Sequence, residues 1–249
     1  MYRGYVMSNG DKYSYIEESL QKYYQFVRVL KKDDKKEILL YKHKVNGKYI
    51  VFRKMAGYYP VYERLQEIQN KNVAEVLEAV CNESETLVLE EYVDGISIAD
   101  MLETSRFREN DMCKIVIQIC EGLYSLHTNR IIHRDIKPEN ILVQGGGTAK
   151  IIDFDSARIH KAYVQKDTVV LGTVGYAAPE QYGETQSDEK SDIYGLGILM
   201  NVMRTGKHPV EKMVPGKIGK IVEKCIMVNP QKRYESVLEI RKKLKKLIY

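Results

Sequence analysis

The feature that most constrains this chain is a run of charged and polar residues near its middle. Residues 133–140 read His-Arg-Asp-Ile-Lys-Pro-Glu-Asn, and Asp153 follows thirteen residues after the end of that run. Short apolar runs at 141–143 and 150–152 adjoin these two positions. The pattern predicts two loops, each beside a short strand, that present polar side chains.

The residue types on these loops suit one kind of chemistry. Asn140 and Asp153 offer the hard oxygen ligands that Mg²⁺ prefers, and Mg²⁺ binds through few protein groups. Asp135 is suited to orient a hydroxyl group and accept its proton, with Lys137 nearby as a fixed positive charge. Phosphoryl transfer requires this combination, because positioning and charge neutralisation carry most of its catalysis.

The composition excludes several other classes of protein. Of the 249 residues, 44% are hydrophobic and 29% are charged, which is a globular rather than a disordered composition. The net charge of +5 arises from 39 basic residues interspersed with 34 acidic ones, so we expect no nucleic-acid partner. The four cysteines include no CxxC pair, which predicts reduced thiols. With no signal peptide and no transmembrane segment in sight, we expect a cytoplasmic protein.

The pattern of the sequence changes at Asp94-Gly95. We expect residues 1–25 to form an extension outside the main fold, and residues 26–92 to form an antiparallel sheet with one helix near 62–68. The strands are expected at 26–30, 38–44, 48–55, 76–81 and 86–92.

Residues 95–249 are predicted to be mainly helical. A long helix is indicated by apolar residues that share one face, and three more helices follow it. The long helix spans Met112 to Leu126, and the others are expected at 191–205, 218–227 and 236–248. The last of them carries lysines and arginines at 241–246. We interpret these as a solvated basic face, and a membrane surface or an acidic partner is the less favoured interpretation.

Further motifs point to a family. Residues 172–180 read Gly-Thr-Val-Gly-Tyr-Ala-Ala-Pro-Glu, residues 192–197 read Asp-Ile-Tyr-Gly-Leu-Gly, and Arg233 follows. With the run at 133–140 and Asp153, they resemble the activation segment, anchoring helix and catalytic loops of eukaryotic-type protein kinases. Lys137 and Thr173 favour the serine/threonine branch. The sequence of these motifs is also similar to that of compact bacterial serine/threonine kinases.

The resemblance extends from about Phe26 to Leu247 and implies an α+β fold with two lobes. The N-lobe, at 26–92, is expected to be a small antiparallel sheet with one helix. The C-lobe, at 95–249, is expected to be larger and mainly helical. The implied function is ATP-dependent transfer of a phosphoryl group to serine and threonine hydroxyls of protein substrates.

The resemblance also implies roles for individual residues. Asp135 is the expected catalytic base, and Lys137 the expected contact of the transferred phosphoryl group. Asn140 and Asp153 are expected to hold Mg²⁺ or Mn²⁺. Arg233 falls where the family places the partner of Glu180.

The resemblance also implies which residues contact the nucleotide and which support the catalytic loop and the activation segment. Val51 and Leu142 are expected beside the adenine, and the backbones of Glu91 and Val93 at its edge. The remaining residues are implied in support: His133 and Phe154 as stacked rings joining the lobes, Arg134 as a dock for a phosphorylated loop, and Thr168, then Ser156, as candidate phosphosites.

The N-lobe departs from the family pattern in the residues expected to bind the nucleotide. Where a glycine-rich loop is expected, residues 31–36 read Lys-Lys-Asp-Asp-Lys-Lys, which we interpret as a solvated charged turn. On the next strand either Arg53 or Lys54 would contact the phosphates. The period of two residues favours Arg53, which places Val51 on the adenine side.

The usual glutamate partner of this strand residue is also uncertain. Glu63 and Glu67 are both candidates, and neither has the expected spacing. Glu90 stands where an apolar residue is expected, and a buried carboxylate there needs a partner. We therefore hypothesise an ion pair between Glu90 and Arg53.

Two departures concern the C-lobe. Asp155 replaces a glycine after Phe154, which predicts a loop that is less able to change conformation. Residues 207–216 are too few for a docking helix of usual length. Two alternative functions stay open: a nucleotide-binding pseudokinase that acts as a scaffold, and a small-molecule kinase.

Overall fold

The computed structural model describes residues 9–160, 173, 175–182 and 187–248. Within this part the chain divides into two compact units. The first, here called the sheet unit, comprises the described parts of Met1–Gln69 together with Ala74–Tyr92. The second, the helical unit, comprises Asn70–Val73 and the described parts of Val93–Tyr249. The candidate phosphosite Thr168 lies outside the described residues.

The sheet unit is built on five antiparallel strands in the order β1-β2-β3-β5-β4. Their bounds are β1 Tyr24–Lys32, β2 Lys36–His43, β3 Tyr49–Ala56, β4 Val76–Cys81 and β5 Glu85–Glu91. A tight turn joins β2 and β3, with Gly47 at a φ of 71° that favours glycine. The antiparallel sheet predicted for this region is confirmed.

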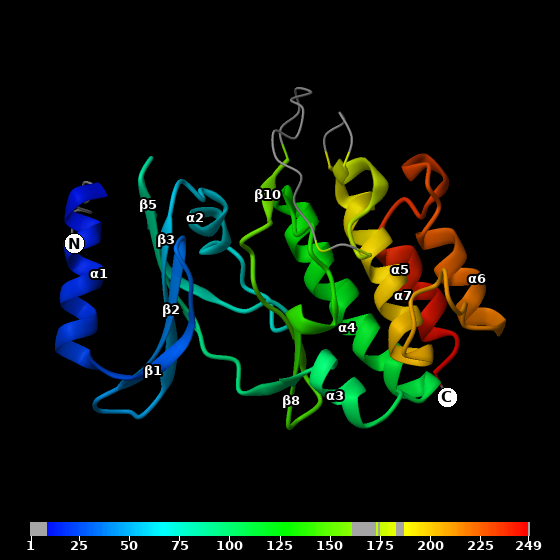
Figure 1. The fold of residues 1–249 in the computed structure, drawn as a ribbon, viewed down its shortest axis with the longest axis horizontal. Coiled ribbons are helices and arrows are strands. Elements are labelled where there is room, and N and C mark those ends of the chain that lie inside the picture. The colour runs from blue at the N-terminus through cyan, green and yellow to red at the C-terminus, as the bar shows by residue number, and fades with distance from the viewer. Residues whose placement is uncertain (1–8, 161–172, 174, 183–186, 249) are drawn as a thin grey trace, which may run out of the picture. The chain divides into compact units, whose positions relative to one another are not determined.

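Helix α1, Asn9–Tyr23, packs against this sheet (Figure 1). Residues 1–25 were expected outside the main fold, whereas Ile16 and Leu20 of α1 are only 2% and 5% exposed. They join a core cluster with apolar residues of β3, β4 and β5, including Phe52 and Leu89. The reason is that residues four apart share one face of a helix, and this pair covers the apolar outer face of the sheet.

The other helix of the sheet unit, α2, is short. It spans Val61–Leu65 and buries Tyr62 and Leu65, as the apolar spacing predicts. Ile68, the third residue of that pattern, is also buried but lies beyond the end of the helix.

The helical unit has two long helices at its centre. Helix α4, Glu109–Thr128, buries the whole predicted apolar face from Met112 to Leu126. Helix α5, Glu189–Thr205, packs against α4 and begins with a capping Asp188. The remaining helices are α3 Ile98–Thr104, α6 Gly216–Cys225 and α7 Val237–Lys245.

Short strands and turns of the helical unit carry the predicted loops. Three strands, β6 Gly95–Ser97, β8 Ile141–Gln144 and β9 Ala149–Ile151, form one small antiparallel sheet, and β7 Ile131–Ile132 pairs with β10 Arg158–Ile159. Single 3₁₀ turns occur at Pro138–Asn140, Pro179–Tyr182 and Pro230–Lys232. The α+β fold class is confirmed, while the predicted domain limits stay a prediction.

Among the described residues, none of the helices is long and apolar enough to span a membrane.

Candidate active site

Three side chains surround the carboxylate of Asp135 in the helical unit. Asn140 Nδ2 donates to Asp135 Oδ2 at 2.9 Å, and Lys137 Nζ lies 2.8 Å from the same oxygen. Thr173 Oγ1 donates to Asp135 Oδ1 at 2.7 Å and accepts from Lys137 Nζ at 2.6 Å. The spacing of Asp135, Lys137 and Asn140 therefore brings them together as predicted.

These contacts set the charge of Asp135. Burial tends to raise the pKa of its carboxyl group, but the hydrogen bonds from Lys137 and Thr173 outweigh burial and hold the pKa below its ordinary value. Asp135 is therefore ionised at neutral pH and able to accept a proton. The sequence analysis used Thr173 only to assign the branch of the family and missed its contact with Asp135.

The loop that carries Asp135 is held by the buried carboxylate of Asp192, in the first turn of α5. The backbone N–H groups of Arg134 and His133 donate to its two oxygens at 2.7 Å and 3.0 Å. His127 Nε2 lies 2.8 Å from Asp192 Oδ2. Burial raises the pKa of Asp192, and the contacts with His127 and His133 outweigh it and lower the pKa overall. No sequence pattern links His127 of α4 to Asp192 of α5, which are 65 residues apart.

The two candidate metal ligands come from adjoining segments. The backbone N–H of Ile152 donates to the carbonyl of Asn140 at 3.0 Å, and Asp153 follows with a left-handed φ of 64°. The ring of Phe154 lies 5.2 Å from that of His133, measured between centroids, so the predicted contact of these rings is present. Leu142 is half-buried on β8. Val93 is buried and is the first residue of the longer of the two segments that form the helical unit.

The hypothesised ion pair between Arg53 and Glu90 is present in the sheet unit. Arg53 Nε lies 2.6 Å from Glu90 Oε1, and the side chains are 7% and 6% exposed. Val51 is directly opposite Glu90 in the register, so Val51, Arg53 and Glu90 share one face of the sheet. Phe52 and Leu89 belong to the other face, which α1 covers.

The alternatives to this pair have other contacts. Lys54 is half-exposed and lies 3.4 Å from Glu85. Glu63 Oε1 accepts from the backbone N–H of Cys81 at 3.4 Å, and Glu67 pairs with Arg64 at an exposed site. Of the two strand candidates, the one favoured by the period of two residues is thus the buried one.

The connection between β1 and β2 is a short charged turn. Asp33 Oδ1 accepts from the backbone N–H groups of Lys35 and Lys36 at 2.9 Å and 3.0 Å. The bond from Lys35 lowers the pKa of Asp33 most. Beside the turn, Lys32 and Glu37 form an exposed ion pair. The interpretation of 31–36 as a solvated charged turn agrees with these contacts.

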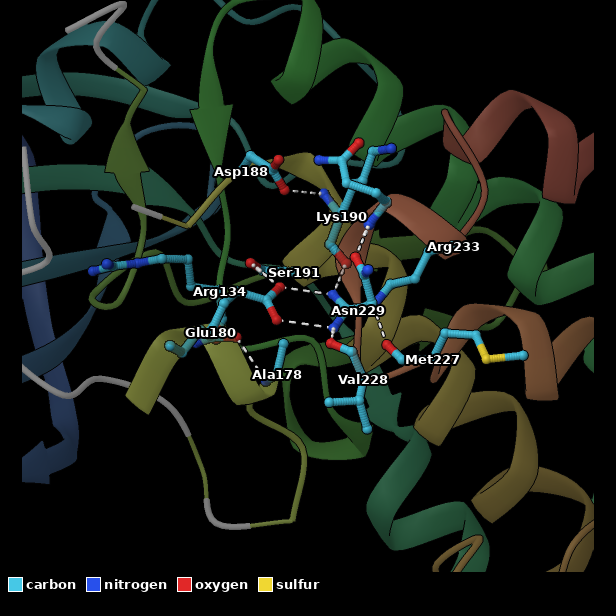
Figure 2. A network of polar contacts seen from close by, with 12 residues as sticks. Arg134, Ala178, Glu180, Asp188, Lys190, Ser191, Met227, Val228, Asn229 and Arg233 are labelled. Atoms are coloured by element: carbon cyan, nitrogen blue, oxygen red, sulfur yellow. Dashed lines mark hydrogen bonds and ion pairs between the residues drawn. The ribbon is translucent and has the colours of Figure 1, made fainter. Parts of the chain in front are cut away.

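The end of the activation segment is fixed by Arg233 (Figure 2). Its guanidinium group binds both oxygens of Glu180, with Nη1–Oε1 at 2.6 Å and Nη2–Oε2 at 2.9 Å. Arg233 also donates to the carbonyls of Lys190 and Met227, and Ser191 donates to Glu180 at 2.8 Å. The predicted partnership of Arg233 and Glu180 is confirmed, and it is a bidentate pair in which the Arg233 side chain is fully buried and the Glu180 side chain is 9% exposed.

Arg134 joins the catalytic loop to two neighbouring segments. Its Nε donates to the carbonyl of Ser156 at 2.7 Å, and its own carbonyl accepts from Gln181 Nε2 at 2.9 Å. Burial, and next the charge of Arg158, lower the pKa of Arg134 to about 10. A phosphate group bound near Arg134 and Arg158 would reduce the repulsion between their positive charges.

Comparison with known proteins agrees with this geometry. Residues 28–249 match the family model of the protein kinase domain. The chain is similar to the serine/threonine-protein kinase STY46 of Arabidopsis thaliana, at 31% identity over 70% of this chain and 32% of that protein. It is also similar to the probable serine/threonine-protein kinase CPE1738 of Clostridium perfringens, at 29% identity over 74% of this chain and 30% of that protein.

A third relative is the serine/threonine-protein kinase PknB of Mycobacterium leprae, at 30% identity over 62% of this chain and 29% of that protein. The matches thus span about a third of the length of these three curated relatives. The family model, by contrast, covers nearly all of this chain. The chain therefore belongs to the protein kinase domain family.

Proposed function

We propose that this chain is a serine/threonine protein kinase that transfers the γ-phosphoryl group of ATP to hydroxyl groups of protein substrates. The observation that carries the proposal is the ionised carboxylate of Asp135, oriented by Lys137, Asn140 and Thr173. A general base must be both ionised and positioned, and these contacts supply both properties.

In the proposed reaction, Asp135 orients the substrate hydroxyl and accepts its proton as the hydroxyl oxygen bonds to the γ-phosphorus. The bond between that phosphorus and the bridging oxygen of the departing ADP breaks in the same displacement. Lys137 stabilises the negative charge of the transferred group. Thr173 forms hydrogen bonds with both side chains and so holds them in fixed positions relative to each other.

Asn140 and Asp153 would hold Mg²⁺ or Mn²⁺. An amide oxygen and a carboxylate on adjoining segments fit an ion that binds through few protein groups and the phosphates of its nucleotide. The bound metal would neutralise charge on the phosphates.

The nucleotide contacts proposed for the two units follow the family pattern. Arg53 would contact the phosphates, while Val51 and Leu142 would contact the adenine faces. The backbones of Glu91 and Val93 would bond to the adenine edge. Support for Arg53 is its burial on the same sheet face as Val51, with Glu90 holding the guanidinium group in place.

We also propose a reducing, cytoplasmic location. All four cysteines are buried and free, and none forms a disulfide. Burial is the main cause that raises the pKa of Cys81 to about 12 and of Cys113 to about 11, which keeps both as unreactive thiols.

The proposal is tested by incubating the purified protein with labelled ATP, Mg²⁺ and a generic protein substrate such as casein. Asp135→Asn keeps the shape but removes the base, and we expect a loss of roughly 10²–10⁴-fold in rate. Asp111→Asn, the same change at an exposed position of α4, is the matched control and should retain activity. Equal labelling by Asp135→Asn and the unaltered protein would refute the proposal.

A nucleotide-binding scaffold is the second candidate. Two features favour a scaffold: the charged turn after β1 and the pairing of Arg53 with Glu90. Each of them changes the residues that usually bind the phosphate groups of the nucleotide. The same preparation distinguishes the two candidates: a scaffold would show a thermal shift with ATP and Mg²⁺ but no phosphoryl transfer. Transfer to an aminoglycoside and not to protein would instead indicate a small-molecule kinase.

A further inference from the structure

A pocket with a strongly basic rim lies in the helical unit, lined by residues of α6 and α7 and by segments next to them. Its volume is about 410 Å³, which is large enough for one or two side chains of a bound partner. We call it the basic pocket. It is lined by Lys217, Lys220, Ile221, Tyr234, Lys243, Lys246 and Leu247.

The pocket combines an apolar floor with a charged rim. Ile221 and Tyr234 are buried and Leu247 is half-buried, whereas all four lysines are exposed. None of these lysines forms an ion pair within the described part of the chain. Glu223 and Glu239, on the same two helices, are exposed, and Glu239 acts electrostatically on Tyr234 of the pocket. The four lysines of the rim outnumber these two carboxylates, so the rim carries a net positive charge.

Two lysines converge on a single ring of the pocket. Lys224 Nζ lies 4.5 Å and Lys243 Nζ 5.9 Å from the ring centroid of Tyr234. Each contact is favourable by itself, since a cation is attracted to the face of an aromatic ring. Together they place two positive charges, one from each helix, around one ring, which favours an anionic partner at this pocket.

We propose that the basic pocket is a docking site for an acidic segment of a partner protein. An apolar side chain of the segment occupies the floor, and flanking carboxylates contact lysines from both helices. The floor argues against nucleic acid, whose backbone is polar throughout. A membrane surface is disfavoured because Ile221 and Tyr234 are buried, so the pocket presents no apolar side chain that could insert into lipid. This docking role is independent of the proposed phosphoryl transfer.

The test uses a fluorescein-labelled peptide, Glu-Glu-Asp-Leu-Phe-Asp-Glu-Glu, and fluorescence anisotropy. We expect saturable binding that weakens as salt increases and that falls at least about tenfold in the variant Lys220→Glu/Lys243→Glu. Lys114→Glu, the same change at an exposed site of α4, should bind like the unaltered protein. Phosphoryl transfer should be equal in all three proteins.

A second variant and two other probes complete the test. Lys220→Gln/Lys243→Gln removes the charges without reversing them, and should weaken binding while leaving the unfolding temperature unchanged. The proposal is overturned if peptide affinity is the same in both double variants and the unaltered protein. It is equally overturned if vesicles containing phosphatidylserine, or an oligonucleotide, bind through these lysines more tightly than the peptide does.

Discussion

The ion pair between Arg53 and Glu90 should contribute strongly to the stability of the sheet unit. With side chains only 7% and 6% exposed, removal of either partner leaves a charge in a region that water does not reach well. We expect Arg53→Met or Glu90→Leu alone to lower the free energy of unfolding by ~3–5 kcal/mol. For a chain of this size that corresponds to a decrease of roughly 6–20 °C in the unfolding temperature.

The double variant Arg53→Met/Glu90→Leu should behave differently. It places apolar side chains of similar volume on the sheet face that Val51 shares, so neither charge is left buried. Replacement of a whole buried pair is often neutral or stabilising, and we expect stability within about 1 kcal/mol of the unaltered protein. The coupling energy in a double-mutant cycle should then be ~5 kcal/mol or more.

A matched control exists one residue along the same strand. Lys54 and Glu85 form a pair of 3.4 Å with side chains 47% and 33% exposed. The corresponding cycle with Lys54→Met and Glu85→Leu should give a coupling energy below ~1 kcal/mol, because solvent screens the pair. Urea unfolding measures all seven proteins of the two cycles, which share the unaltered protein. Equal coupling in the two cycles, or additive effects at Arg53 and Glu90, would refute the reasoning.

Three further predictions concern other parts of the chain. Thr173→Val removes a hydrogen bond that lowers the pKa of Asp135, so the acidic limb of the pH–kcat profile should move to higher pH, whereas Thr173→Ser should restore it. His127→Leu removes a partner of buried Asp192 and should cost ~1–3 kcal/mol in urea unfolding, and Lys114→Leu at an exposed position of the same helix should cost less. Leu20→Ala in α1 should cost ~2–5 kcal/mol, and no loss beyond that of the exposed control Glu17→Ala would show that α1 does not stabilise the sheet.

The sequence predicted the contacts that follow from short spacing or from a simple period. Asp135, Lys137 and Asn140 lie within six residues, so one loop necessarily places them together. The choice of Arg53 over Lys54 follows from the alternation of side chains across a strand, which puts Arg53 on the face of Val51. In both cases local geometry leaves few alternatives.

Other contacts could not be predicted because they join distant elements with no pattern between them. His127 and Asp192 are 65 residues apart and meet only because α4 packs on α5. The position of α1 was missed for a related reason. Its polar, tyrosine-rich sequence shows only a weak helical pattern, and the two apolar residues that matter become informative only beside the outer face of the sheet.

Both faces of the sheet unit thus depend on features that the common kinase pattern does not contain. One face has α1 packed on β3, β4 and β5 through Ile16 and Leu20, before the start of the family match at residue 28. The other carries the buried pair of Arg53 and Glu90. Because β3 contributes Phe52 to the first face and Arg53 to the second, its position is fixed from both sides. A strand fixed in this way holds Arg53 in one orientation, and Glu90 of the neighbouring strand β5 contacts its guanidinium group.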